Sequence, residues 1–478
     1  MFRLCLAVLL PALLAATEPA DKYINAARAF VQTLMEKGTD RYGAVHSPLF
    51  ASMLDLDTMS LPAAKLDELL ADVRGRQVRA IGHGLPEPPA GIRPGDRAPI
   101  GANLEHDIML LRSMYVLSEL TGDARYGKHA DAVLRFWLMN CQSPATGLMA
   151  SGEHMSWDFH HEKAYGDVHE VYRRFPFFDN LYAIDPFRTL RIADGMWLAQ
   201  IGNKKHGDFS RHAQWSEYNA GTGGAPDMGF PRHSGFYIWT YANAYAQSRD
   251  PKYIDRIEVL VESRTAIRLQ PFSLILEPGE FHPVHSIDPA LRILLWDAAE
   301  LVPSRKTAWQ AAVRQLDERA LNQPSALATA RSVWDFAYGD SGISGHGLEY
   351  LTRYHQTRDE RFLALAEQVA DKHLAEGWPA DTSKLWPRAP GQAISLLLTL
   401  SRETHVPAAK QKAYREFAVK LADNSLALFT RNKLFRASGS SNHYESITGA
   451  DDLLYALLQL HCALMRPERP LPHIDVNL

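Results

Sequence analysis

The sequence predicts an all-α protein built as an (α/α) toroid of about six to seven helical hairpins. The first observation behind this prediction is a helix–turn–helix pattern that occurs three times. Each copy has an apolar helical stripe ending at Thr or Ser, then an Asp, then an aromatic residue three positions later. The Asp can cap the second helix while the aromatic packs inside the hairpin. The copies read YVLSELTGDARYGKHADAVL, YANAYAQSRDPKYIDRIEVL and YLTRYHQTRDERFLALAEQV, with Asp123, Asp250 and Asp359 at the turns.

The second observation is that these short turns alternate with long connections rich in Gly, Pro and polar residues. Each long connection leads into the first helix of a pair, so in a ring of antiparallel hairpins all of them gather on one face. That face also carries helix N-termini, which favour anions. The sequence therefore predicts a cleft there, with an open solenoid of hairpins as the alternative. The long connections are expected at about 75–101, 144–185, 202–231, 264–286, 377–387 and 430–447.

Apolar residues at helical spacing predict the remaining helices, and no run of alternating residues predicts a strand. No Ser/Gly-rich linker divides the chain, so residues 18–478 are expected to form a single domain. The further helices are expected near 20–37, 62–74, 186–201, 287–301, 305–319, 323–336, 388–403, 406–429 and 448–465.

The first residues have the pattern of an export signal. A basic start precedes the apolar run LCLAVLLPALLAA and small residues up to Thr17, which predicts a signal peptide over 1–17, with an N-terminal anchor as the alternative. The mature protein is then expected to be secreted or periplasmic, with no membrane association.

Cys141 and Cys462 lie in apolar helical sequence, where they form either buried free thiols or one disulfide. A net charge of −4 with a pI near 6.6 gives no basic footprint for nucleic acid.

Four segments carry a family resemblance: RYGAVHSPLFASMLDLDT (41–58), NLEHDIMLLRSMYVLSELTGDARY (103–126), SGEHMSWDF (151–159) and PRHSGFYIWTYANAY (231–245). Together they resemble exported bacterial (α/α)-toroid polysaccharide lyases, above all polysaccharide lyase family 38, whose members act on glucuronan or alginate. The similarity extends over about residues 25–465. It implies a Tyr as base and acid, with His or Asn and Arg neutralising the carboxylate of the uronate.

The chemistry of such a lyase selects candidate catalytic residues. β-Elimination removes the C5 proton of a uronate and expels the C4 oxygen, so the carboxylate must be neutralised to accept enolate charge. In RHSGFY, Arg232, His233 and Tyr237 lie at an expected helix start, and His233 and Tyr237 share one helical face. We expect Tyr237 to transfer the proton, assisted by His233 or His154, with Arg232 and the helix N-terminus lowering the pKa of the phenol.

Three further segments supply residues for an anionic polysaccharide substrate. In SGEHMSWDF, Glu153 contacts substrate, His154 joins the neutralising group and Trp157 stacks on a sugar ring, although a loop Trp equally often packs in the core. In GDFSRHA, Arg211 and His212 contact the carboxylate, or Arg211 pairs with Asp208. In SGSSNHYES, the expected substrate contacts are Asn442, His443 and Tyr444, and Tyr444 is the second candidate for proton transfer.

Other chemistries remain open. A glycoside hydrolase on the same toroid would use Asp158, Glu153 or Asp451 as acid or base, and a carbohydrate-binding toroid would use none. We expect no cofactor and no metal, because the local His and Glu cluster is not HExxH and indicates a solvated, charged loop. Its members are His160, His161, Glu162, His169 and Glu170, and His346 and Glu349 are expected at the cleft.

Overall fold

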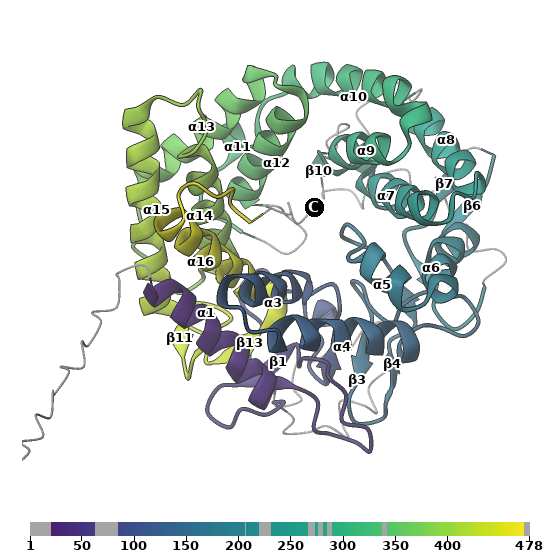
Figure 1. The fold of residues 1–478 in the computed structure, drawn as a ribbon, viewed down its shortest axis with the longest axis horizontal. Helices are drawn as coiled ribbons and strands as arrows, with labels where there is room; N and C mark the ends of the chain where they lie inside the picture. The colour runs from purple at the N-terminus through teal and green to yellow at the C-terminus, as the bar shows by residue number, and fades with distance from the viewer. Residues whose placement is uncertain are drawn as a thin grey trace, which may run out of the picture.

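The computed structural model describes residues 21–62, 85–205, 207–218, 231–265, 273–275, 281–283, 289–336 and 342–472. The predicted signal peptide (1–17) and the helix expected over 62–74 therefore lie outside the described residues, apart from position 62. Figure 1 shows the described helices arranged in two concentric layers around a ring.

The described helices form seven packed pairs, each with one inner and one outer member (Figure 1). The inner helices are α3 (Ile108–Thr121), α5 (Phe178–Ile184), α7 (Pro231–Ser248), α9 (Pro289–Leu301), α12 (Gly342–Thr357), α14 (Arg388–Leu400) and α16 (Ala450–Met465). Their outer partners are, in the same order, α4 (Arg125–Asn140), α6 (Pro186–Ala199), α8 (Lys252–Thr265), α10 (Lys306–Leu321), α13 (Glu360–Glu376), α15 (Ala408–Phe429) and α1 (Asp21–Thr33).

The ring closes where the first and last described helices meet. The last helix, α16, packs against both α1 and α3, while α7, α9, α12 and α14 follow one another around the inner layer. The predicted (α/α) toroid is thereby confirmed, and the open solenoid is wrong.

The three repeated turns have the predicted caps. Asp123, Asp250 and Asp359 each accept a hydrogen bond of 3.0 Å from the backbone N–H two residues later. The aromatic residue three positions after each Asp is buried within its hairpin: Tyr126, Tyr253 and Phe362. A short side-chain acceptor at the turn thus satisfies a helix N-terminus that would otherwise lack a partner.

The long connections meet through small sheets, none of which the sequence pattern predicted. Their strands have two or three residues, too few to show an alternating pattern. They pair as follows: β1 (Met53–Asp55) with β13 (His443–Glu445); β2 (Gly101–Ala102) with β3 (Ser156–Asp158), which also pairs with β4 (Lys163–Tyr165); β5 (Val168–His169) with β8 (Ala213–Gln214); β6 (Ile201–Asn203) with β7 (Asp208–Phe209); β9 (Ser273–Ile275) with β10 (Phe281–Pro283); and β11 (Thr430–Arg431) with β12 (Leu434–Phe435).

Several pairings join different long connections, so those connections share one face, as predicted.

The expected helix over 323–336 is reduced to α11 (Ala326–Thr329), and the expected connection over 144–185 contains β3, β4, β5 and α5. Single-turn elements complete the chain: η1 (Leu34–Gly38), η2 (Pro94–Asp96), η3 (Pro303–Arg305) and η4 (Ser446–Thr448).

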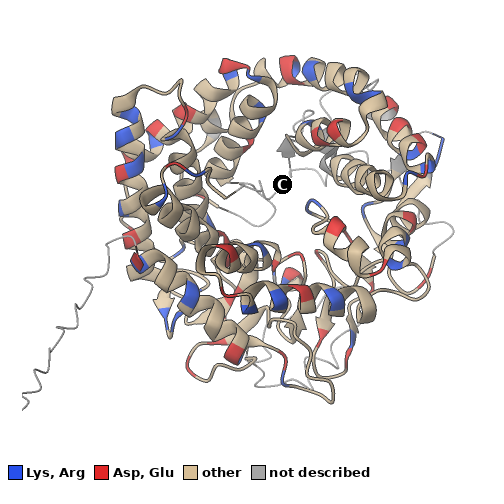
Figure 2. Ribbon diagram, viewed as in Figure 1, with Lys and Arg blue, Asp and Glu red and all other residues tan. Residues whose placement is uncertain are grey.

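One continuous hydrophobic core fills the space between the two layers. Cys141 and Cys462 are buried free thiols, so the disulfide left open by the sequence does not form. Figure 2 shows acidic and basic residues interspersed around the outer helices. Among the described residues, no helix combines the length and the apolar character needed to cross a membrane.

Candidate active site

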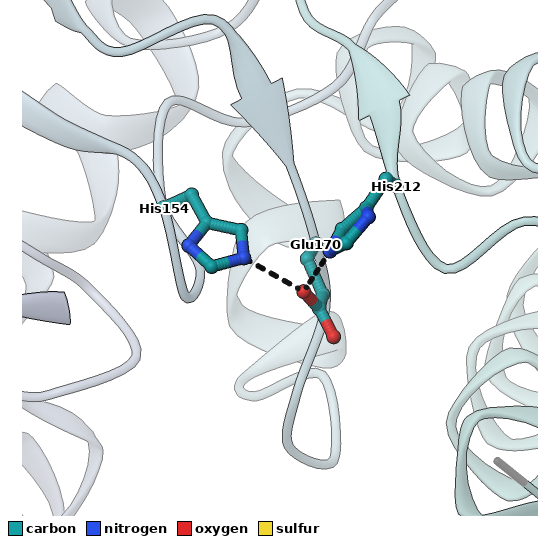
Figure 3. A group of neighbouring side chains, drawn as sticks. All are labelled: His154, Glu170 and His212. Carbon is teal, nitrogen blue, oxygen red and sulfur yellow. Dashed lines mark ion pairs between the residues drawn. The ribbon is translucent and has the colours of Figure 1, made fainter. Parts of the chain in front are cut away.

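Glu170, which directly follows β5, is the centre of a cluster of charged side chains. Its side chain is fully buried. Oε1 accepts a hydrogen bond of 2.7 Å from Nη1 of Arg211 and lies 3.1 Å from Nε2 of His233. Oε2 lies 2.9 Å from Nε2 of His212 and 3.3 Å from Nε2 of His154. Figure 3 shows His154 and His212 on either side of this carboxylate, both directed at it.

Strand pairing places Arg211 and His212 beside Glu170. In the antiparallel pair of β5 and β8, Val168 lies opposite Gln214 and His169 opposite Ala213. Continuing this register by one residue sets Glu170 opposite His212. His233 approaches from a different direction, because it belongs to the first turn of α7.

A glycine allows the third segment to reach the same point. Gly152 has φ of +122°, and a Cβ there would lie 2.1 Å from the carbonyl oxygen of Glu170, so only glycine fits. The backbone N–H of Glu153 donates to that carbonyl at 3.2 Å, and Asn103 Nδ2 donates to the Gly152 carbonyl at 2.8 Å. These contacts hold Glu153 and His154 against Glu170.

A second layer of charge surrounds Glu153 and His154. Glu153 is nearly buried; Oε1 accepts from Nη2 of Arg93 and Oε2 lies 3.7 Å from Nη1 of Arg211. Asp96 Oδ1 lies 3.8 Å from Nδ1 of His154, and the other oxygen of Asp96 accepts from Nε of Arg93. We call the position of Arg93 the rim of the cluster. From the rim to the buried Glu170, cationic and anionic side chains therefore alternate.

This alternation shifts the protonation equilibria of the cluster. Burial opposes ionisation of Glu170, yet the neighbouring His154, His212 and His233 hold its pKa far below the usual range. Burial also acts to lower the pKa of His154, but Glu170 and Glu153 raise it overall. Burial, with the repulsion of Glu170, raises the pKa of Glu153. The centre is therefore an ionised carboxylate surrounded by cationic or proton-donating groups.

Three of these side chains can hold a metal ion. The ligand atoms of His154, Glu170 and His212 lie within 4.8 Å of one another. Glu170 Oε2 lies 2.9 Å from Nε2 of His212 and 3.3 Å from Nε2 of His154, so both imidazoles converge on one carboxylate oxygen. Two imidazoles and one carboxylate suit a first-row transition metal ion.

The sequence analysis expected no metal, and it named Glu170 only as part of a solvated, charged loop. Glu170 was placed in a solvated loop with His169, but both are fully buried or nearly so. His160 and His161 belong to another hairpin, where Asp158 holds them in a turn. The only sequence signal was the density of His and Glu in several connections, because spacing along the chain does not reveal a register between two strands.

Four of the predicted site residues meet in the cluster with His233, namely His154, Glu153, Arg211 and His212. Arg211 and His154 share a partner in Glu170. The side chain of Asp208, the other partner expected for Arg211, lies outside the described residues. The side chain of Arg232 lies outside the described residues. Tyr237 lies in the same helix as His233 but is fully buried in the core, with its ring edge-on to Phe209 at 5.3 Å.

The remaining predicted residues lie elsewhere. Trp157 does not stack over a cleft; it is buried and packs edge-on against Phe136, because β3 turns this side chain into the core. Tyr444 is also fully buried, 6.0 Å from the ring of Phe30. Asn442 donates to Asp57 on an exposed surface, and the buried His443 pairs with Glu445 at 2.9 Å.

The carboxyl groups proposed for a hydrolase also have other partners. Asp158 is fully buried and accepts from the backbone of His160 at 2.8 Å. Asp451 accepts from the backbone N–H of Leu110 at 3.1 Å, so it caps α3 from the neighbouring helix. His346 pairs with Glu349 at 2.8 Å within α12.

A family model described as periplasmic pectate lyase matches residues 92–223. The matched segment contains Arg93, Glu153, His154, Glu170 and the Arg211–His212 pair, that is, the cluster apart from His233. The match indicates a carbohydrate-active enzyme.

Solved structures of carbohydrate-active enzymes resemble the chain at low identity. A cellobiose 2-epimerase from Bacillus thermoamylovorans B4167 is 12% identical with a TM-score of 0.43, covering 76% of this chain and 88% of its own. An unsaturated glucuronyl hydrolase specific for heparin is 12% identical with a TM-score of 0.43, covering 96% and 100%. The GH76A α-1,6-mannanase from Salegentibacter sp. HEL1_6 is 11% identical with a TM-score of 0.41, covering 93% and 100%. No conclusion about activity follows from these likenesses.

Proposed function

We propose that this protein is an exported polysaccharide lyase that cleaves a uronate polymer by β-elimination at the Glu170 cluster. The observation that carries the proposal is the convergence of Arg211, His154 and His212 on one buried, ionised carboxylate. The pectate lyase match covers that same segment. It favours a galacturonate polymer over the glucuronan or alginate expected from the resemblance to family 38.

The main obstacle in this reaction is the weak acidity of the C5 proton. Its removal becomes feasible when the adjacent carboxylate is neutralised, so that the developing enolate is stabilised. A divalent cation held by His154, Glu170 and His212 would supply that positive charge at the substrate carboxylate. Glu170 contributes the negative charge that such a site requires, since its pKa is held far below the usual range.

We assign Arg211 a direct contact with the substrate. Its side chain is 21% exposed, whereas those of His154 and Glu170 are 8% and 0% exposed. A guanidinium binds carboxylate oxygens through its planar donors. Because Arg211 pairs with Glu170 at 2.7 Å and lies 3.7 Å from Glu153, it stays protonated and supplies positive charge at the substrate carboxylate, while a separate base takes the C5 proton.

Proton transfer by Tyr237, the prediction from the sequence, has less support. Its phenol is fully buried in the core. His233 is equally buried and contacts Glu170 from behind, so we assign it the role of positioning that carboxylate.

The experiment is an absorbance assay for the unsaturated uronate product on polygalacturonate, glucuronan, alginate and a neutral mannan. The proposal predicts a rising signal on a uronate polymer and none on mannan, and loss of the signal in His212→Ala. His355→Ala is the matched control, because both histidine side chains are 41% exposed and paired with a glutamate. A signal that falls on unsaturated uronides indicates a hydrolase, and an unchanged signal on every polymer rejects the lyase.

A further inference from the structure

We infer that Arg93 is a specificity-determining residue, which binds the carboxylate of the uronate next to the one that reacts. This inference rests on the proposed function, because it places a second substrate carboxylate at the rim of the same cluster. Nothing in the sequence pattern singled out Arg93.

The exposure of Arg93 separates it from the other members of the cluster. Its side chain is 59% exposed, although its two partners, Asp96 and Glu153, are 1% and 7% exposed. Arg93 is therefore an exposed cation whose two carboxylate partners are buried. These partners hold the guanidinium group in place, and its exposed side can bind an incoming anion.

Glu153 links Arg93 to the proposed catalytic arginine. One of its oxygens contacts Nη2 of Arg93, and the other lies 3.7 Å from Nη1 of Arg211. A single carboxylate thus lies between two guanidinium groups, one deeper and one at the rim. Two neighbouring cations fit a ligand that carries a carboxylate on each of two consecutive sugars.

The segment that carries Arg93 is anchored on both sides. Before it, Ile92 is buried against Trp386, whose Nε1 donates to the carbonyl of Ala90 at 3.1 Å. After it, the buried Arg97 donates to both carboxylate oxygens of Glu445, at 2.7 and 2.9 Å. The rim position of Arg93 is thereby preorganised, which reduces the entropy lost when a ligand binds.

The ligand class follows from this chemistry. The planar donors of arginine match an ionised carboxylate, and the interaction is lost when that group is esterified or replaced by a neutral sugar. Arg93 therefore selects runs of adjacent, unesterified uronates over polymers in which charged and neutral residues alternate.

The test compares initial rates on polygalacturonate and on the same polymer after partial random methyl esterification. Arg93→Ala should raise KM for polygalacturonate by about tenfold or more, the scale of one charge-assisted hydrogen bond, while kcat stays within about twofold. The preference for the unesterified polymer should fall, and Arg93→Lys should restore part of it. Arg125→Ala is the control, since Arg125 is 73% exposed and pairs with Asp123 at 2.7 Å on α4.

Two results would overturn the inference: an unchanged KM and preference in Arg93→Ala, or a fall in kcat alone, which would mean that Arg93 only supports Glu153 and Asp96. Melting temperatures of the variants identify any loss of folding, in which case Arg93→Lys and Arg93→Gln decide. If the wild-type protein forms no unsaturated product, the proposed function fails. Calorimetric binding of an unesterified galacturonate oligomer to the same variants then decides the role of Arg93.

Discussion

His233 and Glu170 are in direct contact in the interior of the toroid, with Nε2 of the imidazole 3.1 Å from Oε1 of the carboxylate. Both side chains are fully buried. The contact ties the first turn of α7 to the segment after β5, so it fixes the carboxylate relative to the inner layer of helices. We infer that the inner helices supply support, while the connections supply the groups that reach substrate.

Glu170→Gln should abolish activity and weaken folding. The amide keeps the shape of the side chain but leaves His154, His212, His233 and Arg211 without their counter-charge. Removing one partner from a buried ionic network costs about 3–5 kcal/mol. We expect a lower melting temperature and a rate at least ~100-fold below wild type, the scale seen when acid–base or charge-stabilising groups are removed. A variant with normal rate on a uronate polymer would contradict this assignment.

Glu105→Gln is the matched control for Glu170→Gln. It should not lower the stability of the folded protein, whereas Glu170→Gln should. Glu105 is also buried, but burial raises its pKa to about 8. The folded protein therefore favours its protonated form, which glutamine mimics. The variant should fold at least as stably as wild type at neutral pH, as measured by thermal unfolding.

The same residue predicts how stability depends on pH. An unfolded glutamate titrates near ~4.3, and Glu105 in the folded protein near about 8. Its contribution to stability is therefore fully present below the unfolded pKa and is lost as pH rises through about 8. The melting temperature of Glu105→Gln minus that of wild type should increase between pH 5 and about pH 9. If this difference in melting temperature stays constant over the same pH range, Glu105 is ionised in the folded state over the whole range.

Gly152→Ala should disrupt the site through the backbone. A methyl group there would lie 2.1 Å from the Glu170 carbonyl oxygen, so the 152–154 segment must move away from Glu170. We expect lost activity and a clear fall in melting temperature. Gly122→Ala is the control, since Gly122 also has positive φ, +72°, but a Cβ at that position would have no neighbouring atom within 4 Å. Equal effects of the two substitutions would attribute the loss to φ strain alone.

The contrast between fold and site shows what a single sequence can predict. The caps at Asp123, Asp250 and Asp359 are local, and so is the helical spacing of apolar residues, which is why the toroid and its shared loop face were predicted. The meeting of Glu170 with His212 depends on the register of two strands of two residues each. Trp157 and Tyr444 were misplaced for a related reason, because the pairing of β3 and β13 decides which way they face.

Tyr237→Phe separates the sequence-based mechanism from the one proposed here. The side chain of Tyr237 is fully buried and packs edge-on against Phe209, so removal of its hydroxyl should change the rate on polygalacturonate by less than about threefold. Arg211→Ala should lower the same rate by ~100-fold or more. A strong loss in Tyr237→Phe with an unchanged melting temperature would return proton transfer to the phenol.

Metal removal tests the His154–Glu170–His212 group apart from catalysis. Dialysis against a chelator should lower the melting temperature of the wild-type protein, and Mn²⁺ or Zn²⁺ should restore it by binding the folded state. His212→Ala should not respond to either ion, whereas the control His355→Ala should respond like wild type. A wild-type melting temperature that is independent of chelator and metal would contradict a metal site.

The central claim is that the Glu170 cluster performs β-elimination, and the mass of the products tests it most directly. Incubation of wild-type protein with a defined galacturonate oligomer should give fragments whose new non-reducing ends are lighter by one water than hydrolysis products. Arg211→Ala should leave the oligomer intact. Fragments of full hydrolytic mass, or unsaturated fragments formed equally by Arg211→Ala, would contradict the account.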